Sequence, residues 1–507
     1  MWSPEFAGYR KSIARLRKDI KICQYAIYCI HIVQGLKTLI PILTRRRLLE
    51  GSIAGLLASA SGGCNGRGSG RRVVVVGAGL SGLNAALILE RWGFEVDVVE
   101  AKTRVGGRLW TLDHLPGSPE GGGNVMGAQY GRVVHMAHHL DIALRTPPRT
   151  LPSDYLIGDE RISRDSWASA AANPLPEAWR TIPPQRLMGK LNETNPLLKT
   201  RAWHDPNLMA SDQSAEVGLK ALGFPNAAIE LINANNSYGN NLSDTSLMAL
   251  YRIMGEFGRL SGPALAVQEA ILGNMRLPEA MAKQLSRPVS LGEPVVAIRH
   301  SPSRVQVALA SGKTLEADAA ILALPLPALE QIEINLSAAQ TTLLKQIDYH
   351  KVVQLHCIVE APFWEAAGWS GSWWTDGLLG RIFTRPIPNT SRYNMTVWIN
   401  GDHCDPLNAL DEAACTQTIT QALWQLVPEA RDVTSVGQLV RWSIDPYAGG
   451  VWALWRPGQA GTAHGAIRAP TGRLFFAGEH TAEAYRGMEG AMESGERAAL
   501  EIMRVLA

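Results

Sequence analysis

The chain has 507 residues and a formal net charge of +3, with 46 % hydrophobic and 19 % charged residues. This length suggests two or three domains, and this composition excludes a disordered or collagen-like chain. No run of 18 uncharged apolar residues is present, which excludes a polytopic membrane protein, and six cysteines without a C-x-x-C pair exclude a disulfide scaffold and a zinc ribbon.

The basic residues gather at the N-terminus. Residues 1–63 hold ten lysines and arginines and three acidic residues, so the remainder of the chain has a net charge of −4. A mildly acidic body does not imply a phosphate-binding surface, and we expect no nucleic-acid partner. Arg45-Arg46-Arg47-Leu48-Leu49 precedes an uncharged stretch over residues 51–60 that ends in Ala58-Ser59-Ala60. This pattern resembles a twin-arginine export signal, which implies the Tat export machinery as a partner and the periplasm as the location.

Three other interpretations of residues 1–64 stay open. The segment could be a basic helix that stays attached to the protein. Cys64 could carry a lipid, although Ser61 stands where a lipidation signal has a large apolar residue. The apolar residues 22–36 could anchor the chain in a membrane, although 15 residues are short for a span. We expect membrane contact only through this segment, if it is retained.

Residues 73–99 follow the order of a dinucleotide-binding unit. Four valines at 73–76 predict a buried parallel strand, and residues 96–99 predict a second strand that ends at Glu100. Between them, the glycines of a G-x-G-x-x-G loop permit a tight turn, let the backbone approach a pyrophosphate and let the next helix pack on the strand. Glu100, 18 residues after the last glycine, can accept hydrogen bonds from ribose hydroxyls, which favours FAD or NAD over NADP. The loop residues assigned to the cofactor are Gly77, Gly79, Ser81 and Gly82.

Further glycine-rich segments lie near this unit and far from it. Arg104-Val105-Gly106-Gly107-Arg108 follows the acid closely, whereas residues 474–481 (LFFAGEHT) and 487–495 (GMEGAMESG) lie near the C-terminus. Together with the first motif they resemble the flavin-containing amine oxidase family, which includes monoamine oxidases, polyamine oxidases and L-amino-acid oxidases. The resemblance implies an α/β fold, α+β overall, with a Rossmann-like FAD-binding domain interleaved with a substrate domain of antiparallel sheet plus helices.

The resemblance implies FAD contacts from several parts of the chain. Glu479 would accept a hydrogen bond from a ribityl hydroxyl, and Val295 would contact adenine. The helix that starts near Met488 would point its N-terminus at the flavin N1–C2=O edge, where negative charge builds on reduction. Val451 stands where monoamine oxidases carry the cysteine that binds FAD, so we expect non-covalent FAD. The other FAD residues implied are Ala101, Arg108, Gly127, Ala128 and Gly478.

The two domains alternate along the chain. Residues 294–298 predict a strand, residues 304–317 predict a hairpin, and residues 352–359 and 393–398 suit strands of the substrate-domain sheet. We expect an N-terminal extension at 1–64, FAD-binding segments at 65–150, 271–330 and 466–507, and substrate-domain segments at 151–270 and 331–465.

The candidate catalytic residues show departures from the family. Gln354 stands where the family often has a lysine linked through water to flavin N5, and Lys351 would face the other side of the strand. His356 shares the face of Gln354 and is either a site residue or a histidine whose hydrogen bonds are satisfied within the fold. Trp452 supplies one of the two aromatic rings that enclose the substrate in amine oxidases. The second ring would fall at Gly487, where Tyr485, two residues earlier, could replace it.

These residues predict an FAD-dependent oxidoreductase that oxidises an amine or amino acid by hydride transfer to flavin N5, with oxygen or another acceptor as oxidant. A C–C desaturase or isomerase on the same fold, or a flavin-binding protein without turnover, are the alternatives. We predict no metal site, because His135, His138 and His139 lack further ligands. A Cys404–Cys415 disulfide, and a substrate carboxylate bound by Arg381 or Arg385, stay open.

Overall fold

The computed structural model describes residues 70–198, 203, 205–210, 212–258 and 267–506. The export signal, the lipidation site and the membrane anchor considered for residues 1–64 lie outside these residues. Among the helices within the described ranges, none combines the length and apolar character needed to cross a membrane.

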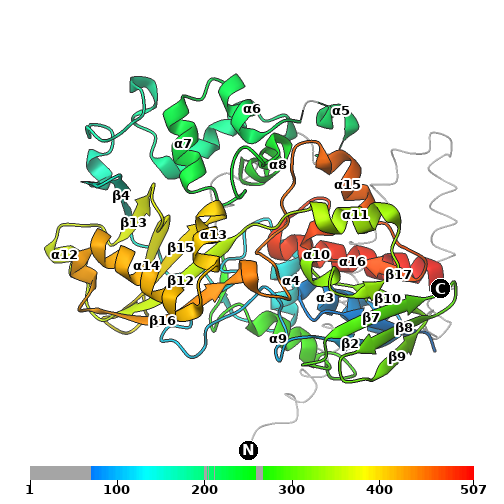
Figure 1. The fold of residues 1–507 in the computed structure, drawn as a ribbon. Helices are drawn as coiled ribbons and strands as arrows, with labels where there is room; N and C mark the ends of the chain where they lie inside the picture. The colour runs from blue at the N-terminus through cyan, green and yellow to red at the C-terminus, as the bar shows by residue number, and fades with distance from the viewer. Residues whose placement is uncertain (1–69, 199–202, 204, 211, 259–266, 507) are drawn as a thin grey trace, which may run out of the picture. The chain divides into compact units, whose positions relative to one another are not determined.

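A four-stranded parallel sheet carries the first glycine motif (Figure 1). Its order is β17-β10-β1-β2, and each neighbouring pair is parallel. The valines of β1 are fully buried or nearly so, as expected for a strand covered on both faces. Because the strands are parallel, their carboxyl ends meet at one edge of the sheet. The strands are β1 (Arg72–Val76), β2 (Glu95–Val99), β10 (Ala319–Leu322) and β17 (Leu474–Phe476).

Two long helices of this region pack tightly against each other. They are α3 (Leu80–Arg91) and α16 (Gly487–Leu506). A β-carbon on Gly495 would overlap the carbonyl oxygen of Ser81, so only glycine permits this approach. Asn84 Nδ2 also donates a hydrogen bond of 2.8 Å to the carbonyl oxygen of Met492. The first turn of α3 is therefore fixed against the middle of α16.

A second sheet has the order β11-β7-β8-β9. Along the chain, β7, β8 and β9 precede β10 of the first sheet, and β11 follows it. This second sheet confirms the predicted strand at 294–298 and the predicted hairpin at 304–317. Its strands are β7 (Val295–His300), β8 (Val305–Leu309), β9 (Thr314–Ala317) and β11 (Glu333–Ile334).

The third sheet has seven strands in the order β16-β12-β15-β14-β13-β4-β5. It is antiparallel as predicted, except that β13 and β4 run parallel. These two strands come from segments separated by some two hundred residues, so no hairpin forces them to be antiparallel. The strands are β4 (Ser153–Ile157), β5 (Glu160–Ile162), β12 (Val352–Val359), β13 (Ser372–Thr375), β14 (Arg381–Pro386), β15 (Tyr393–Asn400) and β16 (Thr434–Arg441).

The two faces of this sheet differ. Helix α14 (Glu412–Leu426) covers one face, where Ile419 and Leu423 share a core with Val353 and Leu355 of β12. The other face carries polar side chains of the central strands. We call it the polar face and define it by Gln354, His356, Arg381, Thr396, Trp398 and Asn400.

Helices of the substrate-domain segments enclose a separate core with Tyr155 and Trp374. They include α6 (Ala215–Ala221), α7 (Asn226–Ala234), α8 (Leu247–Gly258) and α15 (Gln459–Arg468). The other helices and short strands are α4 (Gly131–His139), β3 (Leu144–Arg145), α5 (Pro206–Met209), β6 (Glu269–Ala270), α9 (Arg276–Lys283), α10 (Leu326–Leu329), α11 (Ala338–Gln346), α12 (Phe363–Ala366) and α13 (Asp405–Asn408).

The Cys404–Cys415 disulfide considered above is wrong. Both thiols are free and buried. Cys404 Sγ donates to the carbonyl oxygen of Ile399 at 3.3 Å, and Cys415 lies on the buried side of α14, in the core that this helix shares with the sheet. Each cysteine therefore serves as a small apolar core residue, Cys415 as part of α14 itself.

Candidate functional site

The carboxyl ends of β1, β2 and β17 bring the glycine motifs to one edge of the parallel sheet. We call this the glycine edge. Gly77 follows β1, Glu100 follows β2, and Gly478 follows β17 within two residues. The buried Glu100 carboxylate accepts hydrogen bonds from the amide of Ala78 at 2.8 Å and that of Lys102 at 2.9 Å. The acid is therefore held beside the loop, as a ribose-binding residue of this fold requires.

The glycines of the loop differ in what surrounds them. Gly77 has φ +104°, and a β-carbon there would lie 2.7 Å from the carbonyl oxygen of Ala323. A β-carbon on Gly82 would overlap the carbonyl oxygen of Gly77. Gly79, in contrast, has no atom within 4 Å of an added β-carbon, and Gly107 of the second motif approaches its Cα. Two glycine segments thus form a bare backbone surface that fits a pyrophosphate group.

The C-terminal motif connects this edge to the segment around Trp452. Glu479 is buried and accepts a hydrogen bond of 3.2 Å from the amide of Ala453. Arg108 Nη1 lies 3.8 Å from the Glu479 carboxylate and donates a 2.7 Å hydrogen bond to the carbonyl oxygen of Val451. Two predicted FAD residues therefore fix the backbone on both sides of Trp452.

The other predicted cofactor residues lie on several elements. Ser81 is buried in the first turn of α3, Ala101 follows Glu100, and Val295 is the first residue of β7. Gly478 has φ +132° and donates to Ser494 Oγ at 2.9 Å. Gly127 and Ala128 form a turn before α4, and Met488 is buried in the first turn of α16.

The start of α16 is joined to the start of α4. The Glu489 carboxylate accepts from the amides of Arg132 at 3.0 Å and Val133 at 3.1 Å, and burial raises its pKa. This contact brings Tyr130 next to Gly487, where a β-carbon would lie 2.9 Å from the Tyr130 hydroxyl oxygen. The Tyr130 hydroxyl group therefore lies where a side chain at position 487 would begin. The backbone of Tyr485 is bound elsewhere, to Glu493 and Arg252.

Trp452 contacts two side chains, those of His350 and Arg486, that the sequence did not indicate as its neighbours. The ring of His350 stacks on it, with centroids 5.2 Å apart and planes at 8°. The Arg486 guanidinium lies 5.2 Å from the Trp452 centroid and 5.9 Å from that of Tyr238. We call Trp452, Tyr238, Tyr130 and Arg486 the Arg486 cluster. Only Arg486 had a possible signal in the sequence, because it directly precedes Gly487.

A directed chain of hydrogen bonds crosses the polar face. His350 Nε2 donates to Asn400 Oδ1 at 3.2 Å, and Asn400 Nδ2 donates to Asn235 Oδ1 at 3.0 Å. Arg381 donates to the same Asn235 oxygen at 3.2 Å and to Ser237 Oγ at 2.6 Å. Burial lowers the pKa of His350 to about 3, so it is neutral at physiological pH. Arg381 thus donates to protein oxygens from Nε and Nη2.

Gln354 and His356 contact each other directly. His356 Nε2 donates to Gln354 Oε1 at 2.9 Å, and Thr396 Oγ1 donates to His356 Nδ1 at 3.1 Å. Burial lowers the pKa of His356 to about 4. Both ring nitrogens therefore have partners, which favours the interpretation of His356 as a satisfied structural histidine. Gln354 is opposite Trp398 on β15, and Trp398 Nε1 donates to Asn400 Oδ1. Asn400 in turn contacts His350, whose ring stacks on Trp452.

The remaining candidates lie away from these residues. Arg385 Nε donates to Thr150 Oγ1 at 3.0 Å. His139 faces Arg91 at 3.0 Å and stacks on His135. Within the described ranges, no group of three or more side chains is arranged to hold a metal ion.

Comparison with known proteins agrees with this geometry. The family model for flavin containing amine oxidoreductases matches residues 80–503. The chain is 26 % identical to an L-amino-acid oxidase of Bothrops atrox, over 88 % of this chain and 92 % of the relative. It is 25 % identical to a flavin-containing amine oxidase of Oncorhynchus mykiss, over 85 % of each chain. The fold matches putrescine oxidase bound to putrescine with a TM-score of 0.73 at 23 % identity, over 86 % of this chain and 99 % of that one.

Proposed function

Because the chain belongs to the family of flavin containing amine oxidoreductases, we propose that it oxidises an amine or amino acid at the carbon next to nitrogen. The carbon would lose a hydride and the nitrogen a proton, so that the C–N bond becomes C=N and two electrons reduce the flavin. Oxygen or another acceptor would then take these electrons. The observation that carries the proposal is a pair of hydrogen bonds: Arg108 and Glu479, two of the predicted FAD residues, bind the backbone on either side of Trp452.

The family implies FAD, and the glycine edge fits it. Bound FAD supplies the hydride acceptor. The open backbone at Gly79 would hold the pyrophosphate, Glu100 the ribose and Glu479 a ribityl hydroxyl. The N-terminal dipole of α16 favours negative charge in front of Met488. Because Val451 offers no thiol, we propose that FAD is bound without a covalent link.

The substrate side would orient the reacting carbon and exclude water. Trp452 and Tyr130 offer aromatic surface, and the low pKa values of His350 and His356 keep both imidazoles uncharged. The names of the relatives support an amine or an amino acid as substrate class. Hydride transfer requires mainly position and electrostatics from the protein, so a neutral glutamine at position 354 is compatible with it.

Two departures favour a second candidate. Gln354 and Gly487 stand where the family often has a lysine and a second aromatic ring, and C–C desaturation or isomerisation needs neither. Anaerobic mixing of the FAD-loaded protein with amines, amino acids and polyunsaturated compounds separates the functions by the loss of flavin absorbance. Bleaching by nitrogen compounds alone is expected. Bleaching only by unsaturated compounds would support the second candidate, and no bleaching at all would support a flavin-binding protein without turnover.

We also propose that the protein is exported to the periplasm through the Tat machinery. The support is the run of arginines at 45–47 followed by the uncharged stretch at 51–60. Cell fractionation of the full chain and of a variant with Arg45, Arg46 and Arg47 all changed to lysine tests this. The unchanged chain should appear in the periplasm and the variant in the cytoplasm, whereas equal distribution would contradict export by this route.

A further inference from the structure

We propose that Arg486 binds an anionic group of the substrate, so that the substrate is an amine that carries a carboxylate, such as an amino acid, and not a simple amine or diamine. The inference rests on the proposed function, since it specifies the substrate of the same site. Three observations support it: the position of the Arg486 guanidinium over two rings, the fixed backbone that carries it, and the lack of an ion-pair partner for it among the described residues.

Arg486 is a half-buried cation that contacts two aromatic rings. Its guanidinium lies over Trp452 and Tyr238, at 5.2 and 5.9 Å from their centroids. Among the described residues, none forms a hydrogen bond or an ion pair with this guanidinium. A cation partly removed from water gains from an anionic partner, and a guanidinium can bind a carboxylate through two parallel hydrogen bonds. The site therefore presents an unused carboxylate-binding group.

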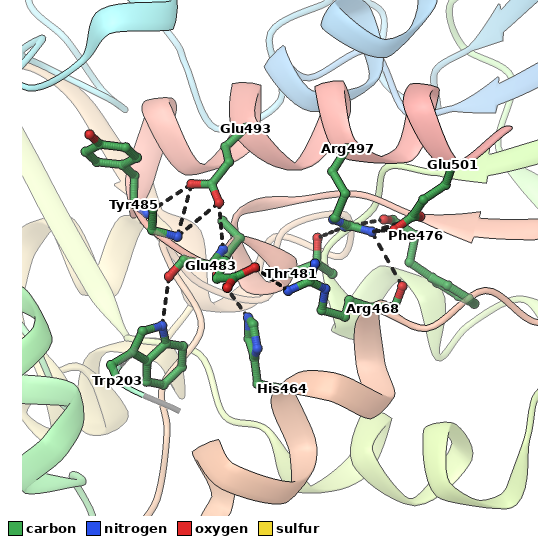
Figure 2. A network of polar contacts seen from close by, with 12 residues as sticks. Trp203, His464, Arg468, Phe476, Thr481, Glu483, Tyr485, Glu493, Arg497 and Glu501 are labelled. Atoms are coloured by element: carbon green, nitrogen blue, oxygen red, sulfur yellow. Dashed lines mark hydrogen bonds and ion pairs between the residues drawn. The ribbon is translucent and has the colours of Figure 1, made fainter. Parts of the chain in front are cut away.

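The loop before Arg486 is rigidly anchored (Figure 2). The Glu493 carboxylate accepts hydrogen bonds of 2.9 to 3.0 Å from the amides of Glu483, Ala484 and Tyr485. Trp203 Nε1 donates to the carbonyl oxygen of Glu483 at 2.8 Å. These contacts fix the amides and a carbonyl group of the loop.

Two further contacts hold the end of the same loop. Arg252 donates to the carbonyl oxygen of Tyr485 at 2.8 Å. The amide of Gly490 donates to the carbonyl oxygen of Arg486 at 3.0 Å, which begins α16. The backbone of Arg486 is thus held on both sides, and its position over Trp452 follows from the fold.

The neighbouring charges do not favour a simple cationic amine. Two acids near the cluster form ion pairs with other arginines, Glu489 with Arg132 and Glu479 with Arg108. The negative charge of Glu256 acts on Tyr130 and Tyr238 of the cluster and on Arg252, one helical turn away. An ammonium group on the face of Trp452 would meet the guanidinium already there. A substrate with both groups can place its carboxylate on Arg486 and keep its nitrogen and C–H away from that charge.

Equilibrium binding tests this without turnover. The FAD-loaded protein is titrated with benzoate and with benzamide, which have the same shape but differ in charge, and flavin absorbance is followed. We expect benzoate to bind at least tenfold more tightly than benzamide. Arg486→Gln should remove this preference and Arg486→Lys should keep part of it. Equal binding of the two probes, or an unchanged preference in Arg486→Gln, would overturn the inference.

Arg431→Gln is the matched control. Arg431 also lies over a tryptophan, at 5.3 Å from the ring of Trp424, but it is exposed and belongs to neither domain's candidate site. Its removal should leave the preference for benzoate unchanged. A similar loss of preference in Arg431→Gln would show that the effect of Arg486→Gln is not local, and would overturn the assignment to Arg486.

Anaerobic reduction by matched pairs, each an amino acid and its decarboxylated amine, separates this inference from the proposed function. Faster reduction by the amino acids, with a KM at least tenfold higher in Arg486→Gln, is expected. Reduction by the amines but not by the amino acids would overturn the inference and leave amine oxidation standing. Reduction by neither would overturn the proposed function, while the benzoate titration still decides the role of Arg486.

Discussion

At the glycine edge, backbone approaches backbone, whereas the polar face and the Arg486 cluster consist of interlocking side chains. Gly77, Gly82 and Gly107 have no room or no conformational freedom for a side chain. At the polar face, a chain of hydrogen bonds joins four side chains: His350 donates to the amide oxygen of Asn400, and Asn400 and Arg381 both donate to the amide oxygen of Asn235. The first region constrains residue types strictly, and the second constrains only size and hydrogen bonding.

This difference indicates how the two regions can change. A glycine in contact with a carbonyl oxygen accepts no other residue, so the cofactor side keeps its sequence motifs. A side-chain network accepts any set of groups that satisfies its donors and acceptors. Residues such as Gln354, Tyr130 and Arg486 can therefore differ between proteins of this fold without a change of the fold.

The largest effect is expected from the glycines of the first motif. Gly82→Ala would place a β-carbon on the carbonyl oxygen of Gly77, so we expect insoluble protein or a melting temperature lower by more than about 10 °C. Gly79→Ala has open space around the new carbon and a φ of −74° that alanine accepts. It should leave the melting temperature of the FAD-free protein unchanged and weaken FAD binding about 100-fold, measured by equilibrium dialysis. Wild-type FAD affinity in Gly79→Ala would mean that the pyrophosphate does not lie on this backbone.

A smaller effect is expected on the polar face. We expect the enzyme to be re-oxidised by an artificial electron acceptor at least tenfold faster than by oxygen, because Gln354 stands where the family often has a lysine. Gln354→Lys should bring the rate of re-oxidation by oxygen closer to the rate with the artificial acceptor, and Gln354→Met should leave the ratio of the two rates unchanged. Stopped-flow re-oxidation of the reduced protein measures both rates. Equal rates with the two acceptors in the unchanged protein would contradict a role of position 354 in the choice of acceptor.

A stability effect of a few degrees is expected from Glu120, which contacts Thr111 and Asn274. Its carboxylate accepts from Thr111 Oγ1 and, at 2.6 Å, from the amide of Asn274, and burial raises its pKa to about 7. Because this pKa lies above the unfolded value, stability is lost as pH rises from about 4.5 to about 7. Glu120→Gln keeps an acceptor oxygen and should melt a few degrees higher than the unchanged protein at pH 8, but equally at pH 4. The exposed Glu330→Gln is the control, and an equal gain at both pH values would contradict titration as the cause.

The contrast between the regions also explains what the sequence could predict. Gly77, Gly79, Gly82 and Glu100 lie within one βαβ unit, so their spacing alone indicates a common site. The Arg486 cluster joins residues from unconnected segments, and the approach of Tyr130 to Gly487 depends on Glu489 binding the first amides of α4. No local pattern encodes such a contact. Likewise, the parallel pairing of β13 with β4 follows from sheet assembly and not from either strand's own residues.

The smallest effect is expected at Lys351, which lies three residues before Gln354. Its Nζ contacts Asp402 at 3.1 Å and Asp405 at 2.7 Å, so its side chain leaves the strand away from Gln354. Such partly exposed pairs contribute less than about 1 kcal/mol, and we expect Lys351→Met to change the free energy of unfolding by no more than that. The rate of flavin reduction and the re-oxidation rates should not change. Successive positions along a strand face opposite sides of the sheet, so a lysine at 351 and a glutamine at 354 should lie on different sides. A tenfold lower rate of flavin reduction in Lys351→Met would mean that this lysine, and not Gln354, serves the flavin. That result would contradict the assignment of the polar face to the site.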